Sequence, residues 1–199
     1  MKVLKFGGTS VANAENISKV IDILLTASKK QNIAVVVSAL GGVTDDLLHA
    51  GELATNRDQK YIDIFESIKE RHVITAQKLI STTEVIDVIS AIETKLEELK
   101  NILQGIYLIN EFSDKSKDKL LSFGELLSSY IISQALNQKS TKSTLKDSRE
   151  LIITDNLHTQ ANVNSKKTNK FNHKELKEVF DLCLSCKACA SECPSNVDI

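Results

Sequence analysis

Apolar residues switch between strand-like runs and helix-like spacing along the first part of the chain. The run that includes Val3 begins a short strand at 2–6, and the unbroken apolar run Ile33–Val37 predicts a second strand at 33–38. Between them, apolar positions recur every three or four residues over Ala14–Lys30, which predicts an amphipathic helix. This order forms a β-α-β unit, so the strands are expected to be parallel. The β-branched second run is typical of a strand buried on both faces.

Longer helical patterns follow. The spacing predicts helices over Asp45–Ala54, Asp58–Ile80, Thr83–Ile106 and Lys115–Asn137. Thr44 is expected to cap the first of these. A short link favours an antiparallel pair for the second and third, although the heptad repeat in the third would also suit a coiled-coil seam. His72 falls on an apolar stripe, where we expect a satisfied core histidine rather than a metal ligand.

The remaining chain changes in character. Short extended runs are expected at Thr141–Leu145 and Leu151–Thr154, and the polar, basic segment Ser165–Lys170 predicts a linker. A further helix is expected over His173–Leu184. The fold class is therefore α/β: a partial three-layer sandwich over 1–168 with parallel strands and a long helical pair, followed by a short helical cysteine-rich tail over 169–199.

Composition excludes several classes of function. Hydrophobic residues make up 42% and charged residues 26% of the 199 positions, as in ordinary soluble domains. The net charge of −1 gives no broad attraction to nucleic acid or to an anionic membrane. No apolar run approaches the length of a membrane span, and the first residues predict a strand rather than a secretory signal. A cytoplasmic location is the expectation.

The first strand leads into a glycine turn that could bind phosphate. Lys5 stands at the strand end, and Gly7, Gly8, Thr9 and Ser10 separate it from the helix. Glycines allow the backbone to approach an anion, and N–H groups at a helix N-terminus point toward it. The Walker pattern is not present. Without further support, a tight turn beside a surface lysine would be the simpler interpretation.

Two other positions are candidates for ligand contacts. The second strand ends at Ser38 and runs into a glycine-bearing loop that reaches Thr44. Ligands bind at the carboxyl edge of open α/β sheets, although a capped surface loop is equally compatible with this spacing. On the last long helix, Glu125 lies among Ser122, Ser128 and Ser129 at helical spacing. This carboxylate could bind a substrate ammonium, or it could simply be solvated.

All four cysteines lie near the end of the chain. Cys183, Cys186, Cys189 and Cys193 are followed by Pro194, which gives the run C-x2-C-x2-C-x3-C-P. This spacing is typical of bacterial iron–sulfur proteins, so a 4Fe-4S cluster is a candidate cofactor. Zinc sites usually separate their cysteine pairs more widely. Four unrelated reduced thiols are the remaining alternative.

Four blocks resemble aspartokinases of the amino-acid kinase superfamily, especially the bifunctional aspartokinase–homoserine dehydrogenase type. They are KFGGTSVANAENI, SFGELLSS, DSRELIITD and ANVN, in the family order. The resemblance implies transfer of phosphate from ATP to L-aspartate, with magnesium carried by the nucleotide. It implies that Lys5 and the Gly7–Ser10 turn contact phosphate and that Ser38, Thr44 and Glu125 contact aspartate. A homo-oligomer is also a possibility under this resemblance.

The tail resembles a different family. The string EVFDLCLSCKACASECPSNVD is similar to the cluster-binding stretch of FAD-linked oxidases and glycolate-oxidase-type iron–sulfur subunits. The chain has no match to the later G-R-G-G-S-D-like loop of aspartokinases. It therefore resembles a fusion of two shortened parts, and little kinase activity is expected from it alone. An electron-transfer module or a non-catalytic remnant are the alternatives.

Overall fold

A parallel pair of strands is the centre of the fold. The computed structural model describes residues 1–81, 84–139 and 141–164. Strand β1 (Lys2–Phe6) pairs in parallel with β2 (Ile33–Val37), and helix α1 (Ala14–Ser28) connects them. The predicted β-α-β unit is confirmed. In the register, Phe6 is opposite Val37, so both strands end at the same edge.

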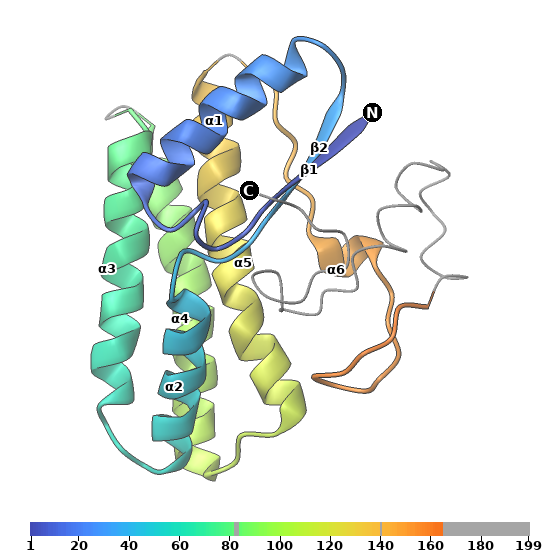
Figure 1. Ribbon diagram of the computed structural model, residues 1–199. Helices are drawn as coiled ribbons and strands as arrows, with labels where there is room; N and C mark the ends of the chain where they lie inside the picture. Colours follow the sequence, from blue (N-terminus) through green and yellow to red (C-terminus); the bar gives the residue numbers. More distant parts are fainter. Residues whose placement is uncertain (82–83, 140, 165–199) are drawn as a thin grey trace.

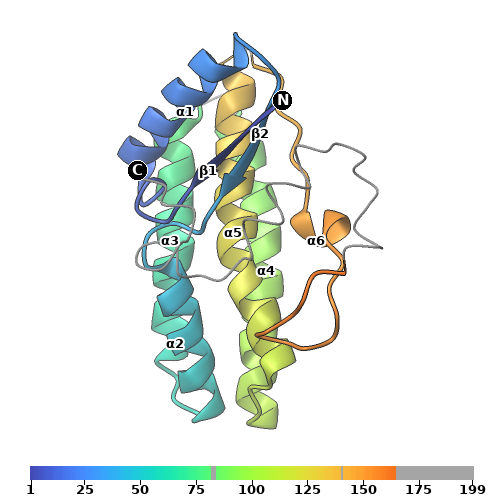
Figure 2. The same ribbon diagram turned by 45° about the vertical axis from the view of Figure 1, so that its right-hand side comes forward.

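The two faces of this sheet differ in their surroundings. Leu4, Phe6, Val35 and Val37 pack against the hydrophobic core. Because side chains alternate along a strand, the paired residues Lys5 and Val36 lie on the opposite face. Val36 is 47% exposed, so the expectation that the second strand is buried on both faces is wrong for the described part of the chain. Among the described residues, the helices cover only one face of the β1–β2 sheet, as Figures 1 and 2 show.

Four long helices form a layer beside the sheet. They are α2 (Val43–Thr55), α3 (Tyr61–Leu79), α4 (Val85–Ile109) and α5 (Asp114–Gln138). They run alongside one another and extend beyond the strands, while α1 lies across their upper end in Figure 1. The predicted antiparallel pair is α3 and α4. The heptad positions Ile92, Leu96, Leu99 and Leu103 are buried within this layer, so the repeat is a core-packing stripe.

The two helix starts near the loops have different caps. Asn13 caps α1, and its side-chain oxygen accepts a hydrogen bond from the Asn16 amide at 2.9 Å. The expectation that Thr44 caps the next helix is wrong. Gly42 is the N-cap of α2, with a left-handed φ of +81° and no side-chain cap. Thr44 therefore lies inside the first turn of α2.

His72 is buried on α3, as its apolar stripe predicts. Its Nδ1 lies 2.7 Å from the Ile68 carbonyl oxygen, which can only accept, so Nδ1 carries the proton. The buried Nε2 has no hydrogen-bond partner, so the expectation of a satisfied histidine holds for one nitrogen only. Burial lowers the pKa of His72 from 6.5 to about 4; the Ile68 hydrogen bond opposes this change, and Arg71 adds to it.

The segment after α5 differs from its predicted extended runs. Residues 141–147 have no regular structure, and Leu151 ends a short helix, α6 (Ser148–Leu151). An isolated antiparallel bridge joins Thr154 to Val163. The predicted linker, the helix His173–Leu184 and all four cysteines lie outside the described residues. No helix in the described part combines the length and apolar content that a membrane span requires.

Candidate functional site

The glycine turn after β1 is tied to the first turn of α1. The amides of Ser10 and Val11 both donate to the Gly7 carbonyl, at 3.0 and 3.3 Å. The Asn16 side chain donates to the Thr9 carbonyl at 2.8 Å. The turn is thus held in shape by its own backbone and by the helix that follows. Because the Ser10 amide is already used, a contact from Ser10 to an anion would come from its hydroxyl group.

The loops that follow the two strands touch each other at the carboxyl edge of the sheet. The Ser38 amide donates to the Phe6 carbonyl at 3.1 Å, which extends the strand pairing by one residue. A Cβ placed on Gly8 would lie 3.6 Å from the Ala39 carbonyl oxygen. One placed on Gly41 would lie 2.9 Å from the Ala12 Cβ, so this approach requires a glycine. The two glycine-bearing loops therefore form one continuous surface.

Helix α5 packs directly onto this surface. The buried hydroxyl of Ser128 donates to the Ser38 carbonyl at 2.7 Å. A Cβ on Gly124 would lie 2.7 Å from the Ala39 Cβ, which shows how closely the helix approaches the loop. The exposed Glu125 is the next residue. Glu125 and Lys5, the penultimate residue of β1, consequently lie toward the same end of the sheet.

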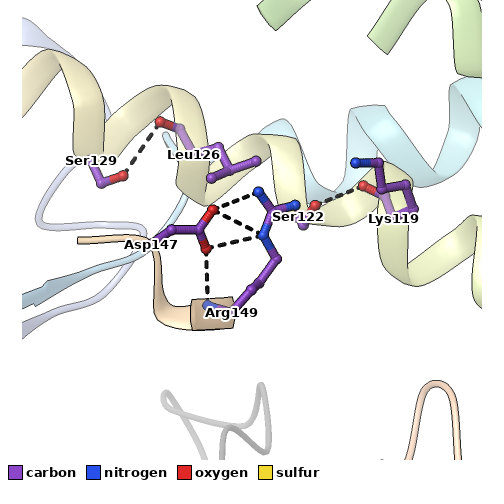
Figure 3. Close-up of polar contacts among 6 residues, drawn as sticks. All are labelled: Lys119, Ser122, Leu126, Ser129, Asp147 and Arg149. Carbon is purple, nitrogen blue, oxygen red and sulfur yellow. Dashed lines mark hydrogen bonds and ion pairs between the residues drawn. The ribbon is translucent and has the colours of Figure 1, made fainter. Parts of the chain in front are cut away.

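The serines around Glu125 do not form the predicted ring of hydroxyls. Ser122 donates to the Lys119 carbonyl at 2.8 Å, and Ser129 donates to the Leu126 carbonyl at 3.3 Å (Figure 3). Ser128 faces the loop, as described above. All three hydroxyls bind backbone carbonyls, because serine hydroxyls in helices commonly bond the preceding turn. Glu125 is the exposed charged side chain of this stretch and stays the candidate for a ligand contact.

An ion pair from the segment after α5 lies beside this helix. The Arg149 guanidinium donates to both carboxylate oxygens of Asp147, with an Nη2–Oδ2 distance of 2.6 Å (Figure 3). Asp147 also caps α6 by accepting from the Arg149 amide at 2.9 Å. These hydrogen bonds lower the pKa of Asp147 and raise that of Arg149. This ion pair holds residues 147–149 in a folded turn.

One residue of the site gave no signal in the sequence. Arg71 of α3 donates to the Gly41 carbonyl and forms an ion pair with Asp46, with an Nη1–Oδ2 distance of 3.1 Å. It joins the loop after β2 to a helix 30 residues further along the chain. An arginine on the polar side of a helical pattern is ordinary, so no motif could have identified it.

The other described surfaces add no chemistry to the site. Among residues 1–81, 84–139 and 141–164, no three His, Cys, Asp or Glu side chains are grouped to hold a metal ion. Two shallow grooves, one between α3 and α4 around Phe65 and Lys69 and one on α1 around Ile23, lie away from the glycine loops. The convergence of two loops and α5 at the sheet edge is the arrangement suited to a ligand.

Comparison with known proteins shows the family of the chain. The family model described as "Amino acid kinase family" matches residues 1–181. The chain belongs to the amino acid kinase family. Aspartokinase 1, chloroplastic, of Arabidopsis thaliana is 39% identical over 158 residues, which cover 77% of this chain and 26% of that protein. The bifunctional aspartokinase/homoserine dehydrogenase 1, chloroplastic, of Zea mays is 30% identical and matches 76% of this chain and 16% of its own length.

Solved structures show the same fold. E. coli aspartokinase III in complex with aspartate and ADP superposes with a TM-score of 0.77 at 23% identity, and the match covers 91% of this chain and 38% of that one. This protein therefore contains an aspartokinase-like amino acid kinase domain with the expected α/β fold. The chain spans about a quarter of the Arabidopsis relative and less of the maize relative.

Proposed function

We propose that this chain provides the phosphate-binding and aspartate-binding edge of an aspartokinase-type phosphotransferase, which transfers phosphate from ATP to L-aspartate. The observation that carries the proposal is the convergence of the Gly7–Ser10 turn, the Ser38–Thr44 loop and α5 at one edge of the sheet. The aspartokinase relatives and the E. coli protein named for its aspartate and ADP complex support these substrates.

Lys5 and the glycine turn are assigned to the phosphate groups. Phosphoryl transfer depends on positioning and on neutralising charge, and a lysine at the end of β1 supplies a positive charge beside the turn. Helix α1 begins at Ala14, four residues after Ser10, and its N-terminus adds a favourable dipole. Magnesium would arrive with the nucleotide, because Mg²⁺ prefers phosphate oxygens and water to an all-protein cage.

Glu125, Ser38 and Thr44 are assigned to L-aspartate. The Glu125 carboxylate would bind the substrate ammonium by a charge-assisted hydrogen bond. Ser38 begins the loop that α5 contacts, and Thr44 lies in the first turn of α2 at the other end of that loop, so both side chains could reach the carboxylates of the same molecule. A substrate held in this way would be close to the phosphate-binding turn, because Gly8 and Ala39 are neighbours.

The variant Lys5→Ala tests the phosphate assignment. We expect it to weaken binding of Mg-ADP by about tenfold or more, since it removes a charge-assisted contact. Isothermal titration calorimetry of the purified chain measures this change. Lys2→Ala is the matched control, because Lys2 is an exposed lysine at the other end of the same strand. Equal affinities for the Lys5→Ala and unaltered proteins would contradict the assignment.

Turnover is a separate question from binding. The chain contains no match to the family's G-R-G-G-S-D-like loop, and misplacement of bound substrates costs orders of magnitude in rate. We therefore expect the 199-residue chain to trap aspartyl phosphate with hydroxylamine at rates far below the roughly 1–100 s⁻¹ of kinases. A rate within that range, lost in Lys5→Ala, would show that the chain is a competent enzyme.

We propose a second, independent role for the segment 169–199. The spacing of Cys183, Cys186, Cys189 and Cys193 supports a 4Fe-4S cluster, with Cys193 as the uncertain fourth ligand. Anaerobic reconstitution with iron and sulfide should give broad visible absorbance, and replacing the first three cysteines with serine should abolish it. Absorbance that does not develop in the unaltered protein would contradict the cluster and leave four reduced thiols.

A further inference from the structure

Arg71 connects helix α3 to the loop between β2 and α2. Its guanidinium donates to the Gly41 carbonyl and lies 3.1 Å from the Asp46 carboxylate. These acceptors stand on either side of Gly42, whose left-handed φ of +81° makes the chain turn sharply into α2. One planar side chain therefore spans the bend, with one nitrogen on the loop and another on the helix.

This contact replaces a missing cap. The N-cap residue Gly42 has no side chain, so no side chain at that position caps the start of α2. Asp46 lies in the first turn, where the helix dipole favours its negative charge, and Arg71 holds it there. The same guanidinium binds the Gly41 carbonyl just ahead of the helix. Residues 38–44 are thus held by their own hydrogen bond from the Val43 amide to the Leu40 carbonyl and by two side chains from outside the loop, Ser128 at Ser38 and Arg71 at Gly41.

We infer that Arg71 is a positioning residue for L-aspartate: it orders the loop that begins at Ser38 and the first turn of α2 that carries Thr44, without touching the substrate itself. This inference rests on the proposed function. A guanidinium can bind two acceptors at once in a fixed fork, whereas a lysine ammonium is a single flexible point charge. Lysine at this position should therefore restore only part of the effect.

The effect should differ between the two ligands. Arg71 joins the loop that begins at Ser38 to the first turn of α2, which carries Thr44. The Gly7–Ser10 turn is held instead by its own backbone hydrogen bonds and by Asn16. Loss of Arg71 should weaken L-aspartate binding more than Mg-ADP binding. A mere loss of fold stability would weaken both ligands together, so the ratio of the two affinities separates positioning from general destabilisation.

The experiment compares Arg71→Met, Arg71→Lys and the unaltered chain. The matched control is Lys69→Met, which removes another cation of α3 whose partner is Glu93 of α4, at 3.8 Å. L-aspartate affinity is measured by ligand-observed NMR titration and Mg-ADP affinity by calorimetry. Amide hydrogen exchange over residues 38–46 reports on the order of the loop without any ligand.

For Arg71→Met we expect L-aspartate affinity to fall by about tenfold, because the loop must be ordered on binding, with less than about a twofold change for Mg-ADP. Exchange over 38–46 should accelerate, Arg71→Lys should be intermediate, and Lys69→Met should match the unaltered protein.

Unchanged aspartate affinity, or an equal fall for both ligands, would overturn the inference. If the unaltered chain binds Mg-ADP but no L-aspartate, the aspartate assignment fails and the role of Arg71 toward it fails too. If exchange is also unchanged in Arg71→Met, Arg71 does not order the loop at all.

Discussion

Lowering the pH from 7.5 to 5 is expected to reduce the free energy of unfolding by about 2 kcal/mol through His72 alone. In the folded protein the pKa of His72 is about 4, whereas the ordinary value is 6.5. The folded state therefore binds fewer protons than the unfolded state between these values. The stability that neutral His72 provides is complete above about pH 6.5 and is lost as the pH falls toward 4.

The structure gives the reason for this sensitivity. His72 is fully buried, its Nδ1 proton is bound to the Ile68 carbonyl, and Nε2 has no partner. Protonation would place a second N–H and a positive charge in the core, beside the positive charge of Arg71. Neither would be compensated, and an uncompensated buried charge is strongly unfavourable.

The variant His72→Leu tests this prediction in urea unfolding experiments across the pH range. We expect the loss of stability between pH 7.5 and 5 to shrink by about 2 kcal/mol, since the titrating group is gone. At neutral pH the change should be small, because an unpartnered buried nitrogen is removed together with one hydrogen bond. His49→Gln is the control, since His49 is exposed on α2. The same pH dependence in His72→Leu and the unaltered chain would refute the role of His72.

Replacing Gly124 with alanine is expected to destabilise the fold by about 1–3 kcal/mol, as overpacking does. The new Cβ would lie 2.7 Å from the Ala39 Cβ, so α5 or the loop after β2 must move. This cost outweighs the gain of up to about 1 kcal/mol that alanine brings inside a helix. The movement would also strain the hydrogen bond from Ser128 to the Ser38 carbonyl, which holds the candidate aspartate loop.

Exchanging the two residues, glycine at 39 and alanine at 124, tests whether the Gly124→Ala effect comes from this one contact. In the double variant Ala39→Gly with Gly124→Ala, the methyl group moves from the loop to the helix and the contact is relieved. We expect the double variant to lose less unfolding free energy than the two single variants lose in total, by about 1 kcal/mol or more. Gly105→Ala is the control, because nothing lies within 4 Å of its Cβ position on α4, and it should be neutral or stabilising. Urea unfolding is measured for the unaltered protein, the two single variants, the double variant and the control, and strict additivity would contradict the contact.

Local patterns in the sequence determined the β-α-β unit and the positions of the long helices. Each depends on residues close together in the chain: apolar spacing for the strands and helices, and a glycine turn after β1. The Asn13 cap of α1 was not predicted, although its hydrogen bond spans only three residues. The family resemblance of the KFGGTS and SFGELLSS blocks also came from the sequence. These features were predictable because neighbouring residues alone produce them.

The tertiary structure decided which residues support the candidate site. The Ser128 hydroxyl binds a carbonyl 90 residues away, and Arg71 binds one 30 residues away, so neither partner could be inferred from local spacing. Thr44 was expected as a cap, but the N-cap is Gly42, so α2 starts two residues earlier. The second strand was expected to be covered on both faces, yet Val36 is 47% exposed. Such outcomes depend on what packs against each residue from elsewhere in the chain, and a one-dimensional pattern does not contain that information.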